Sequence, residues 1–317
     1  MMMIKKFSII AAVFAGMTLT SCEDFFDVSP EDKLQGKDYP STKSELYSGY
    51  MGLAACVQQV ADKAIFIEGL RSNALEPTPN STDEIIDIYN YNDLSDNEFV
   101  SPAGYYNVVL NVNDYIAHAK AFYEKNSRVM EAEEFAALVG SALRYKAWAY
   151  LMMAKLYGEA VWVDDPLTGY QDLSDYPVSD FNTLIENCIK TIETGITING
   201  QPINGRGNIK WVEALQLSAS ENWHWDRITP PAEALLAELY LEKAVLANSP
   251  ASYQKALDWG YAAIRLGDQG TGKPMFVLTN SNYNGEWSNL FISDLGKGAS
   301  RESIFLMTYD YTQQQTN

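Results

Sequence analysis

The sequence predicts a mostly α-helical protein, built from helical hairpins with long loops and a few short β-strands. Three observations indicate this class. Apolar residues recur at helical spacing along several stretches, one pair of such stretches occurs twice, and β-like runs are few and short. The chain has 317 residues, which is long enough to bury a substantial core.

The first expected helix starts at a capping box. Thr42 supplies a hydroxyl that caps the first amide groups, and Glu45 reaches back to the start of the helix. The residues that follow place their apolar side chains at the spacing of one helical face, so we expect that face to be buried. Its members are Leu46, Tyr50, Leu53, Ala54, Val57 and Ala61.

A loop-rich stretch and two longer helices come next. Residues 70–101 contain many Asn, Asp and Tyr residues and are expected to form loops. A second helix is expected to start near Pro102. A third is expected from about Glu131 to Tyr157, because Gly158 is suited to a C-cap. The apolar face of the second helix consists of Tyr105, Val108, Val109, Val112, Ile116, Ala119 and Tyr123.

Two pairs of helical segments resemble each other. Segments 180–195 and 252–267 both place apolar residues at i, i+3, i+4, i+7, i+8 and i+11, and both stop at a glycine. Each follows a strongly helical segment, 147–158 in one case and 234–245 in the other. This pattern resembles tetratricopeptide-like helical hairpins. The alternative is two unrelated helix pairs in an ordinary α-helical domain, since the spacing between the copies differs from the standard period.

The chain changes character after Gly267. Gly, Asn and Ser become frequent, and short β-like runs occur at 276–278 and 303–307. The sequence stops soon after the second run without a finishing helix. A buried strand normally needs partners on both sides, so we expect a copy that is truncated at its C-terminus.

The composition argues against several classes of function. The chain holds 41 acidic residues against 23 Lys and Arg residues, with a formal net charge of -18. Such a chain repels nucleic acid and anionic lipid surfaces. It has no CxxC, HExxH or EF-hand pattern, no phosphate loop and no nucleophile elbow, so no metal, cofactor or catalytic site is expected. Carboxylates are too abundant for any one pair to indicate a glycoside hydrolase.

The N-terminus has the three parts of a secretion signal. Lys5 and Lys6 are followed by an apolar run from Phe7 to Met17, which is too short to cross a bilayer comfortably. The exit Leu-Thr-Ser-Cys resembles a bacterial lipoprotein signal, in which Cys22 becomes the lipid-carrying first residue. We therefore expect a signal peptide at 1–21, an acidic tether at 22–40 and a helical domain at 41–317. No later run would span a membrane, so the lipid alone is the expected membrane contact.

Cysteine usage leaves some alternatives open. An ordinary leader with a stray thiol is the alternative for Cys22. Cys56 and Cys188 lie on or beside apolar helical stripes, which favours small buried side chains over a disulfide or a metal pair.

Three short stretches carry side chains suited to hold a hydroxyl-rich ligand, which needs exposed aromatic planes with polar groups at their edges. In the first, Trp223 and Trp225 would share a face of an extended loop, with Asn222 and Asp226 beside them. Packing of both tryptophans under the following helix is the alternative.

The second stretch is the loop with Arg71 and Asn73, and the third is the tyrosine-rich stretch around Tyr91. For Tyr91 the alternative is a solvated loop. We treat these residues, together with those around Trp225, as candidate ligand contacts.

Several segments in order resemble one family, the SusD/RagB outer-membrane lipoproteins of Bacteroidota. Each motif alone is weak, but their order along the chain is specific. The similar segments are TSCEDFFDVSPED, ELYSGYMGL, GYYNVVLNVNDYIAHA, ALRYKAWAYLMMAKLYGEAVWV, ITPPAEALLAELYLEKA and ESIFLMTYDY.

This resemblance implies a surface lipoprotein of the outer membrane that is not an enzyme. Such proteins sit as a lid on a SusC-like TonB-dependent transporter and capture glycans, or in some members peptides, for import. They form tetratricopeptide-like helices with a loop-rich ligand face and are usually longer than this chain. Glu23, Asp24 and Asp27 resemble their surface-export signal. The alternative is a tetratricopeptide-like periplasmic scaffold lipoprotein that binds a protein partner.

Overall fold

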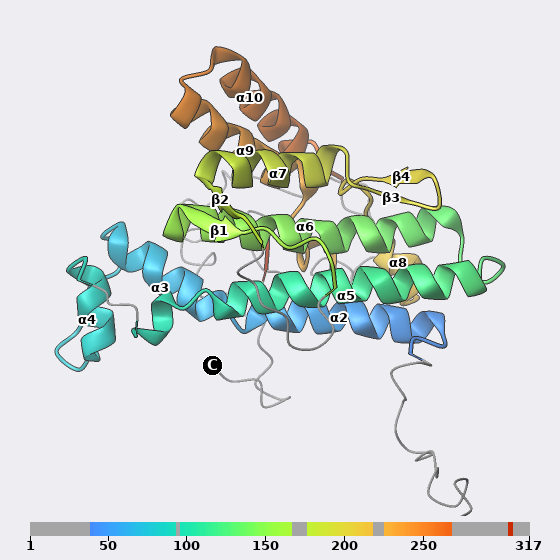
Figure 1. Cartoon of the computed structure of the whole chain (residues 1–317), viewed down its shortest axis with the longest axis horizontal. Helices are drawn as coiled ribbons and strands as arrows, with labels where there is room; N and C mark the ends of the chain where they lie inside the picture. The colour runs from blue at the N-terminus through green and yellow to red at the C-terminus, as the bar shows by residue number, and fades with distance from the viewer. Residues whose placement is uncertain (1–38, 93–95, 167–175, 218–224, 268–303, 307–317) are drawn as a thin grey trace, which may run out of the picture. The chain divides into compact units, whose positions relative to one another are not determined.

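Helices make up most of the structure, as the sequence predicts. The computed structural model describes residues 39–92, 96–166, 176–217, 225–267 and 304–306 (Figure 1). The predicted signal peptide and nearly all of the predicted tether lie outside these ranges. The helices are α2 (Lys43–Gln58), α3 (Ala61–Arg71), α4 (Asp83–Tyr89), α5 (Ala103–Lys125), α6 (Ala132–Tyr157), α7 (Phe181–Glu193), α8 (Trp211–Ala214), α9 (Ala232–Ala247) and α10 (Pro250–Ile264).

Short elements connect these helices. Two 3-10 turns, η2 (Glu98–Val100) and η4 (Trp225–Arg227), lie in connections. Strand β1 (Glu159–Val161) pairs antiparallel with β2 (Val178–Asp180). Strand β3 (Ile196–Ile198) pairs antiparallel with β4 (Gln201–Ile203). Among the described residues these are the only strands, which agrees with the prediction of few and short β-runs.

Helix α6 is the centre of the packing. It contacts α2, α5, α7 and α9, and Figure 1 shows it between α5 and α7. Every residue from Ala137 to Ala154 is buried. A helix buried on all sides must be stabilised mainly by its neighbours, because its own propensity is a weak contribution.

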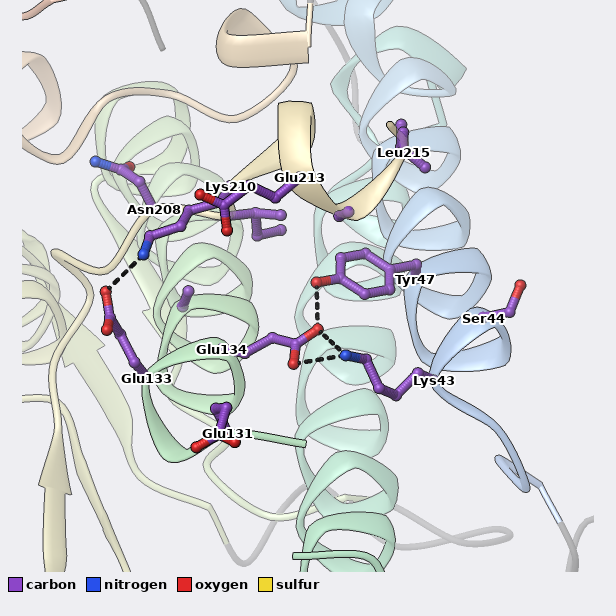
Figure 2. A pocket seen from close by; sticks show the side chains of 13 residues that line it. Lys43, Ser44, Tyr47, Glu131, Glu133, Glu134, Asn208, Lys210, Glu213 and Leu215 are labelled. Atoms are coloured by element: carbon purple, nitrogen blue, oxygen red, sulfur yellow. Dashed lines mark hydrogen bonds and ion pairs between the residues drawn. The ribbon is translucent and has the colours of Figure 1, made fainter. Parts of the chain in front are cut away.

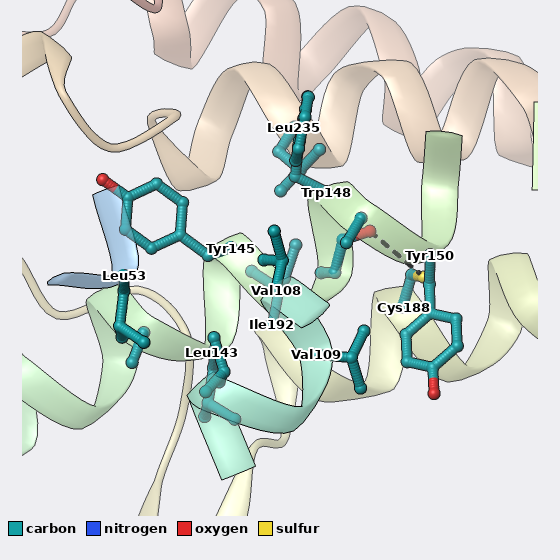
Figure 3. Close-up of a cluster of buried hydrophobic side chains, with 14 of the residues drawn as sticks. Leu53, Val108, Val109, Leu143, Tyr145, Trp148, Tyr150, Cys188, Ile192 and Leu235 are labelled. Atoms are coloured by element: carbon teal, nitrogen blue, oxygen red, sulfur yellow. Dashed lines mark hydrogen bonds between the residues drawn. The ribbon is translucent and has the colours of Figure 1, made fainter. Parts of the chain in front are cut away.

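The main hydrophobic core lies where α5, α6, α7 and α9 meet. Each fully buried Val, Leu or Ile side chain contributes about 1.5–3 kcal/mol to folding. Cys188 lies in this core, where its thiol donates to the Ala147 carbonyl at 3.5 Å and burial raises its pKa. Cys188 and the half-buried Cys56 are free thiols, as the sequence favours. Figure 3 shows Val108, Val109, Leu143, Trp148, Cys188, Ile192 and Leu235 in one cluster.

The predicted ends of two helices are confirmed. The Thr42 hydroxyl accepts from the Glu45 amide at 3.2 Å, and the Glu45 carboxylate accepts from the Thr42 amide at 3.4 Å. Helix α6 ends at Gly158, which has the left-handed φ of 77° and donates its amide to Ala154 at 2.9 Å. Both ends follow from local side-chain chemistry, which is why the sequence alone predicts them.

The region after the first helix differs from the prediction. The apolar face that continues to Ala61 is broken, because the Val60 amide bonds the Val57 carbonyl at 3.2 Å and closes a tight last turn of α2. The stretch 70–101, predicted as loops, contains α4 and η2. Helix α4 is too short for a clear apolar period. It forms because Ile88 is buried in a small cluster with Ile67 and Leu70.

The two similar helix pairs are present but lie in different environments. Helix α7 packs against α6, and α10 packs against α9 (Figure 1). The apolar residues of α7 from Leu184 to Ile192 are buried. In α10 the corresponding side chains of Tyr253, Leu257, Tyr261 and Ile264 are exposed.

The β3–β4 hairpin turns through Asn199 and Gly200. Both residues have positive φ, 51° and 79°, as expected for an Asn-Gly turn that joins two antiparallel strands. The predicted run 276–278 lies outside the described residues. In the predicted run 303–307, residues 304–306 form a bend rather than a strand, and Leu306 donates its amide to the Arg227 carbonyl at 2.9 Å. Among the described helices, none is both long and apolar enough to span a bilayer.

Candidate functional site

Buried polar side chains of α6 fasten three neighbouring segments. The Arg144 guanidinium donates to the carbonyls of Gly205 and Gly207 at 2.8 and 2.6 Å and to Asn208 Oδ1 at 3.0 Å. Its side chain is almost fully buried, and this burial lowers its pKa. The segment 205–208 is therefore held in place against α6.

The other two segments are held by tyrosines. The Tyr145 hydroxyl donates to the Ile228 carbonyl at 2.6 Å. The Tyr150 hydroxyl accepts from the Val163 amide at 2.7 Å and donates to the Val161 carbonyl at 3.2 Å. Burial raises the pKa of both tyrosines, so their hydroxyls stay protonated and able to donate at neutral pH. Two of the three segments reach a pocket wall, one through Asn208 and the other through Trp162.

The first pocket, the α2–α6 pocket, lies where the starts of α2 and α6 face α8. Its cavity volume is about 470 Å³. Glu134 lies at its centre, between Lys43 and Tyr47 (Figure 2). The lining residues are Lys43, Ser44, Tyr47, Glu131, Glu133, Glu134, Ala137, Asn208, Ile209, Lys210, Glu213, Ala214 and Leu215.

Ion pairs occupy much of the polar lining of the α2–α6 pocket. The Lys43 ammonium lies 2.8 Å from the Glu134 carboxylate, which also accepts from the Tyr47 hydroxyl at 2.8 Å. Lys210 pairs with Glu133 at 3.1 Å. Burial, followed by the Glu134 carboxylate, raises the pKa of Tyr47, which keeps its hydroxyl a donor. Most polar groups of this pocket are therefore engaged with one another.

The second pocket, the Lys146 pocket, lies between α5, α6, α7 and the start of β3. Its cavity volume is about 390 Å³. Both polar and apolar residues line it. The lining residues are Asn113, Ile116, Leu143, Lys146, Trp162, Asp164, Asn187, Lys190, Thr191, Gly195, Ile196 and Thr197.

Lys146 is the unusual residue of this pocket, because only 4% of its surface is exposed. Its ammonium donates to Asp164 Oδ1 at 2.9 Å and to Asn113 Oδ1 at 3.0 Å, and it lies 5.2 Å from the centre of the Trp162 ring. Burial lowers the pKa of Lys146, and the Asp164 carboxylate partly opposes this effect. Trp162 in turn stacks on Tyr150, with ring centres 4.1 Å apart.

A third location joins two of the stretches singled out in the sequence. The Tyr91 hydroxyl donates to the Arg71 carbonyl at 2.5 Å, which brings the end of α4 to the end of α3. The Tyr91 ring is 67% exposed, and Asn73 is exposed beside Arg71 in sequence. Tyr91 and Asn73 both have left-handed φ, 57° and 58°. We call Arg71, Asn73 and Tyr91 the Tyr91 surface.

The remaining predicted contacts lie elsewhere. Trp225 is half-buried in η4, and its ring centre lies 5.2 Å from that of Trp211 in α8, the helix that precedes it. Asp226 is half-buried in the same turn. In Figure 1, α8 and the pair α3 and α4 lie at opposite ends of α5, so Trp225 is far from the Tyr91 surface. Asn222, Trp223 and Cys22 lie outside the described residues.

The pocket residues were not found from sequence. Lys146 lies inside the third expected helix, and no motif marks Trp162 as a binding residue. One signal was available, because Arg144 and Lys146 interrupt a long run of apolar residues at 142–154. Charged residues inside such a run must find partners or a cavity.

Comparisons with known proteins give one similarity. No family model matches the chain, and a search of curated proteins finds no match. Among solved structures, the chain is similar to the crystal structure of a SusD-like protein from Bacteroides fragilis, with a TM-score of 0.48 and 15% sequence identity. The match covers 87% of this chain and 46% of that one, so the chain spans about half the length of that protein.

Proposed function

We propose that this chain is a non-catalytic binding protein, a lipid-anchored outer-membrane protein that holds a glycan or other nutrient at the cell surface. It would deliver the ligand to a SusC-like TonB-dependent transporter. The leader that ends at Cys22 supports the lipid anchor, and the motif order supports the partner. The single observation that carries the binding role is the Tyr91 surface.

The Tyr91 ring has the features of a stacking platform. It is exposed and yet held by its hydroxyl at 2.5 Å from the Arg71 carbonyl. A ring that is fixed before binding loses little conformational entropy when a sugar stacks on it. Asn73 is exposed two residues after Arg71, whose carbonyl accepts from the Tyr91 hydroxyl, and its side-chain amide suits the hydroxyls of a pyranose. Asn73 and Tyr91 take left-handed φ because each follows the last turn of a helix, which fixes the main chain at both positions.

Replacing Tyr91 by alanine is expected to weaken glycan binding about tenfold, which corresponds to the loss of roughly 1.4 kcal/mol of contact free energy. Isothermal titration of the purified protein against a panel of oligosaccharides measures this. Tyr91→Phe keeps the ring but loses the bond to Arg71, so it should have a smaller effect. Tyr253→Ala removes an exposed tyrosine from α10 and should leave binding unchanged. Equal binding by wild type and Tyr91→Ala contradicts the proposed site, and released hydrolysis products contradict the non-catalytic role.

Replacing Cys22 by alanine should leave an unacylated protein in the soluble fraction, since the lipid supplies the membrane attachment. Fractionation of cells labelled with a fatty acid measures both effects. Retention of unlabelled Cys22→Ala in the membrane fraction would contradict the anchor. The matched control is Cys56→Ala, which removes a half-buried thiol and should stay labelled.

A second candidate function is a periplasmic scaffold that binds a protein. The apolar side chains exposed on α9 and α10, among them Val245, Leu257 and Ile264, favour it because such patches often mark protein contacts. Protease treatment of whole cells separates the two functions. A surface protein is digested, whereas a periplasmic one is protected.

A further inference from the structure

The Lys146 pocket is a built cavity with a buried charge. Its volume of about 390 Å³ falls within the usual size of small-molecule sites, which is roughly 300–1,000 Å³. Apolar side chains of Ile116, Leu143 and Ile196 form part of the wall. Burying a lysine beside them costs free energy unless its charge is compensated, so the lysine needs close anionic or polar partners.

The charge of the buried Lys146 ammonium group is only partly compensated by its neighbours. An ammonium group has three N–H donors, and two of them are used by Asp164 and Asn113. The Asp164 side chain is 72% exposed, so it reaches Lys146 from the solvent side and much of its charge is screened by water. Asp165 also acts on Lys146 but is exposed and does not line the pocket.

A second cation faces the same cavity. Lys190 of α7 lines the pocket, and none of the ion pairs between described residues includes it. The acidic residues next to Lys190 on α7 are engaged by α9, since Glu186 pairs with Lys243 at 3.0 Å and Glu193 accepts from Tyr240 at 3.0 Å. These two acids therefore have partners on α9, while Lys190 lines the pocket. This arrangement is unusual in a chain with a net charge of -18.

We propose that the Lys146 pocket binds an acidic sugar, whose carboxylate lies between Lys146 and Lys190. The two ammonium groups neutralise the carboxylate. The ligand thereby gives Lys190 an anionic partner and gives Lys146 a second one beside Asp164. Asn187, Thr191 and Thr197 supply donors and acceptors for ring hydroxyls, and the apolar wall packs against the ring carbons. The site uses none of the residues of the Tyr91 surface and does not depend on the proposed function.

Isothermal titration with three probes tests the ligand class. Galacturonate, galactose and acetate separate the carboxylate from the sugar ring. Galacturonate is expected to bind at least about tenfold more tightly than either galactose or acetate. Equal binding of galacturonate and galactose, equal binding of galacturonate and acetate, or no binding of galacturonate overturns the proposal.

Substitutions of single lysines test where galacturonate binds. Lys190→Gln changes an exposed side chain and is expected to weaken galacturonate binding about tenfold. Lys120→Gln, which alters a surface lysine of α5, should leave it unchanged. Lys146→Met should abolish binding, and circular dichroism checks that this variant is folded. Unchanged binding by Lys190→Gln overturns the site, and so does a loss of galacturonate binding in Tyr91→Ala, which would place the acid at the Tyr91 surface.

Discussion

Replacing Arg144 by alanine is expected to lower the free energy of unfolding by about 3–5 kcal/mol. The side chain is only 2% exposed, and its guanidinium donates to the carbonyls of Gly205 and Gly207 and to Asn208. Alanine removes these charge-assisted bonds and leaves buried acceptors without their donor. It also leaves a cavity beside α6, which adds to the cost.

A matched control lies in the segment that Arg144 holds. Arg206 is exposed, and its guanidinium lies 4.9 Å from the centre of the Trp259 ring. Arg206→Ala should therefore cost no more than about 1 kcal/mol. Urea denaturation followed by circular dichroism measures both variants. Equal losses would contradict the anchoring role of Arg144, because they would mean that any arginine in this region matters alike.

Replacing Gly195 by alanine is expected to cost about 2–5 kcal/mol of unfolding free energy. Gly195 has a φ of 70°, which disfavours any side chain. An added Cβ would also overlap the carbonyl oxygen of Ile203, which is backbone and cannot rotate away. The strain falls at the start of β3 and on the wall of the Lys146 pocket.

A substitution at Gly200 separates the cost of the left-handed backbone from the cost of the overlap with Ile203. Gly200 has a similar φ of 79°, but an added Cβ there would meet no atom within 4 Å. Gly200→Ala should therefore show only the backbone cost of about 1–2 kcal/mol. Thermal and urea unfolding of the two variants give the difference. If Gly195→Ala is no worse than Gly200→Ala, the close approach of Ile203 has no energetic effect.

The sequence predicts those parts of the fold that depend on local chemistry. The capping box at Thr42 and the C-cap at Gly158 form as expected because each involves residues close in sequence. The break between α2 and α3 has no such signal, since no Gly or Pro marks it. Helix α4 depends on packing against α3, which no local pattern shows.

The candidate sites also depend on contacts between segments that are distant in sequence. The sequence places Arg71 and Tyr91 in two separate candidate stretches. They come into contact only because the segment between α3 and α4 reverses the chain, which no local pattern predicts. For the Lys146 pocket the sequence gives only a weak signal, because α6 is buried on every side and the charged residues Arg144 and Lys146 alone interrupt its apolar run at 142–154. Its walls come from α5, α7 and the segment 162–164, which are distant in sequence.

The hydrogen bonds made by α6 affect which substitutions this fold can accept during evolution. Arg144, Tyr145 and Tyr150 mostly bond the main chain of their partner segments, at Gly205, Gly207, Ile228, Val161 and Val163. Every residue carries a main-chain carbonyl, and every residue except proline carries an amide hydrogen. The bonds themselves therefore do not depend on which side chains those segments carry. Exchange is still limited where the side chain is buried, as at Val163 and Ile228, or where an added Cβ would meet backbone, as at Gly205. Exposed positions such as Arg206 can change, so a new ligand contact can arise there while the framework stays the same.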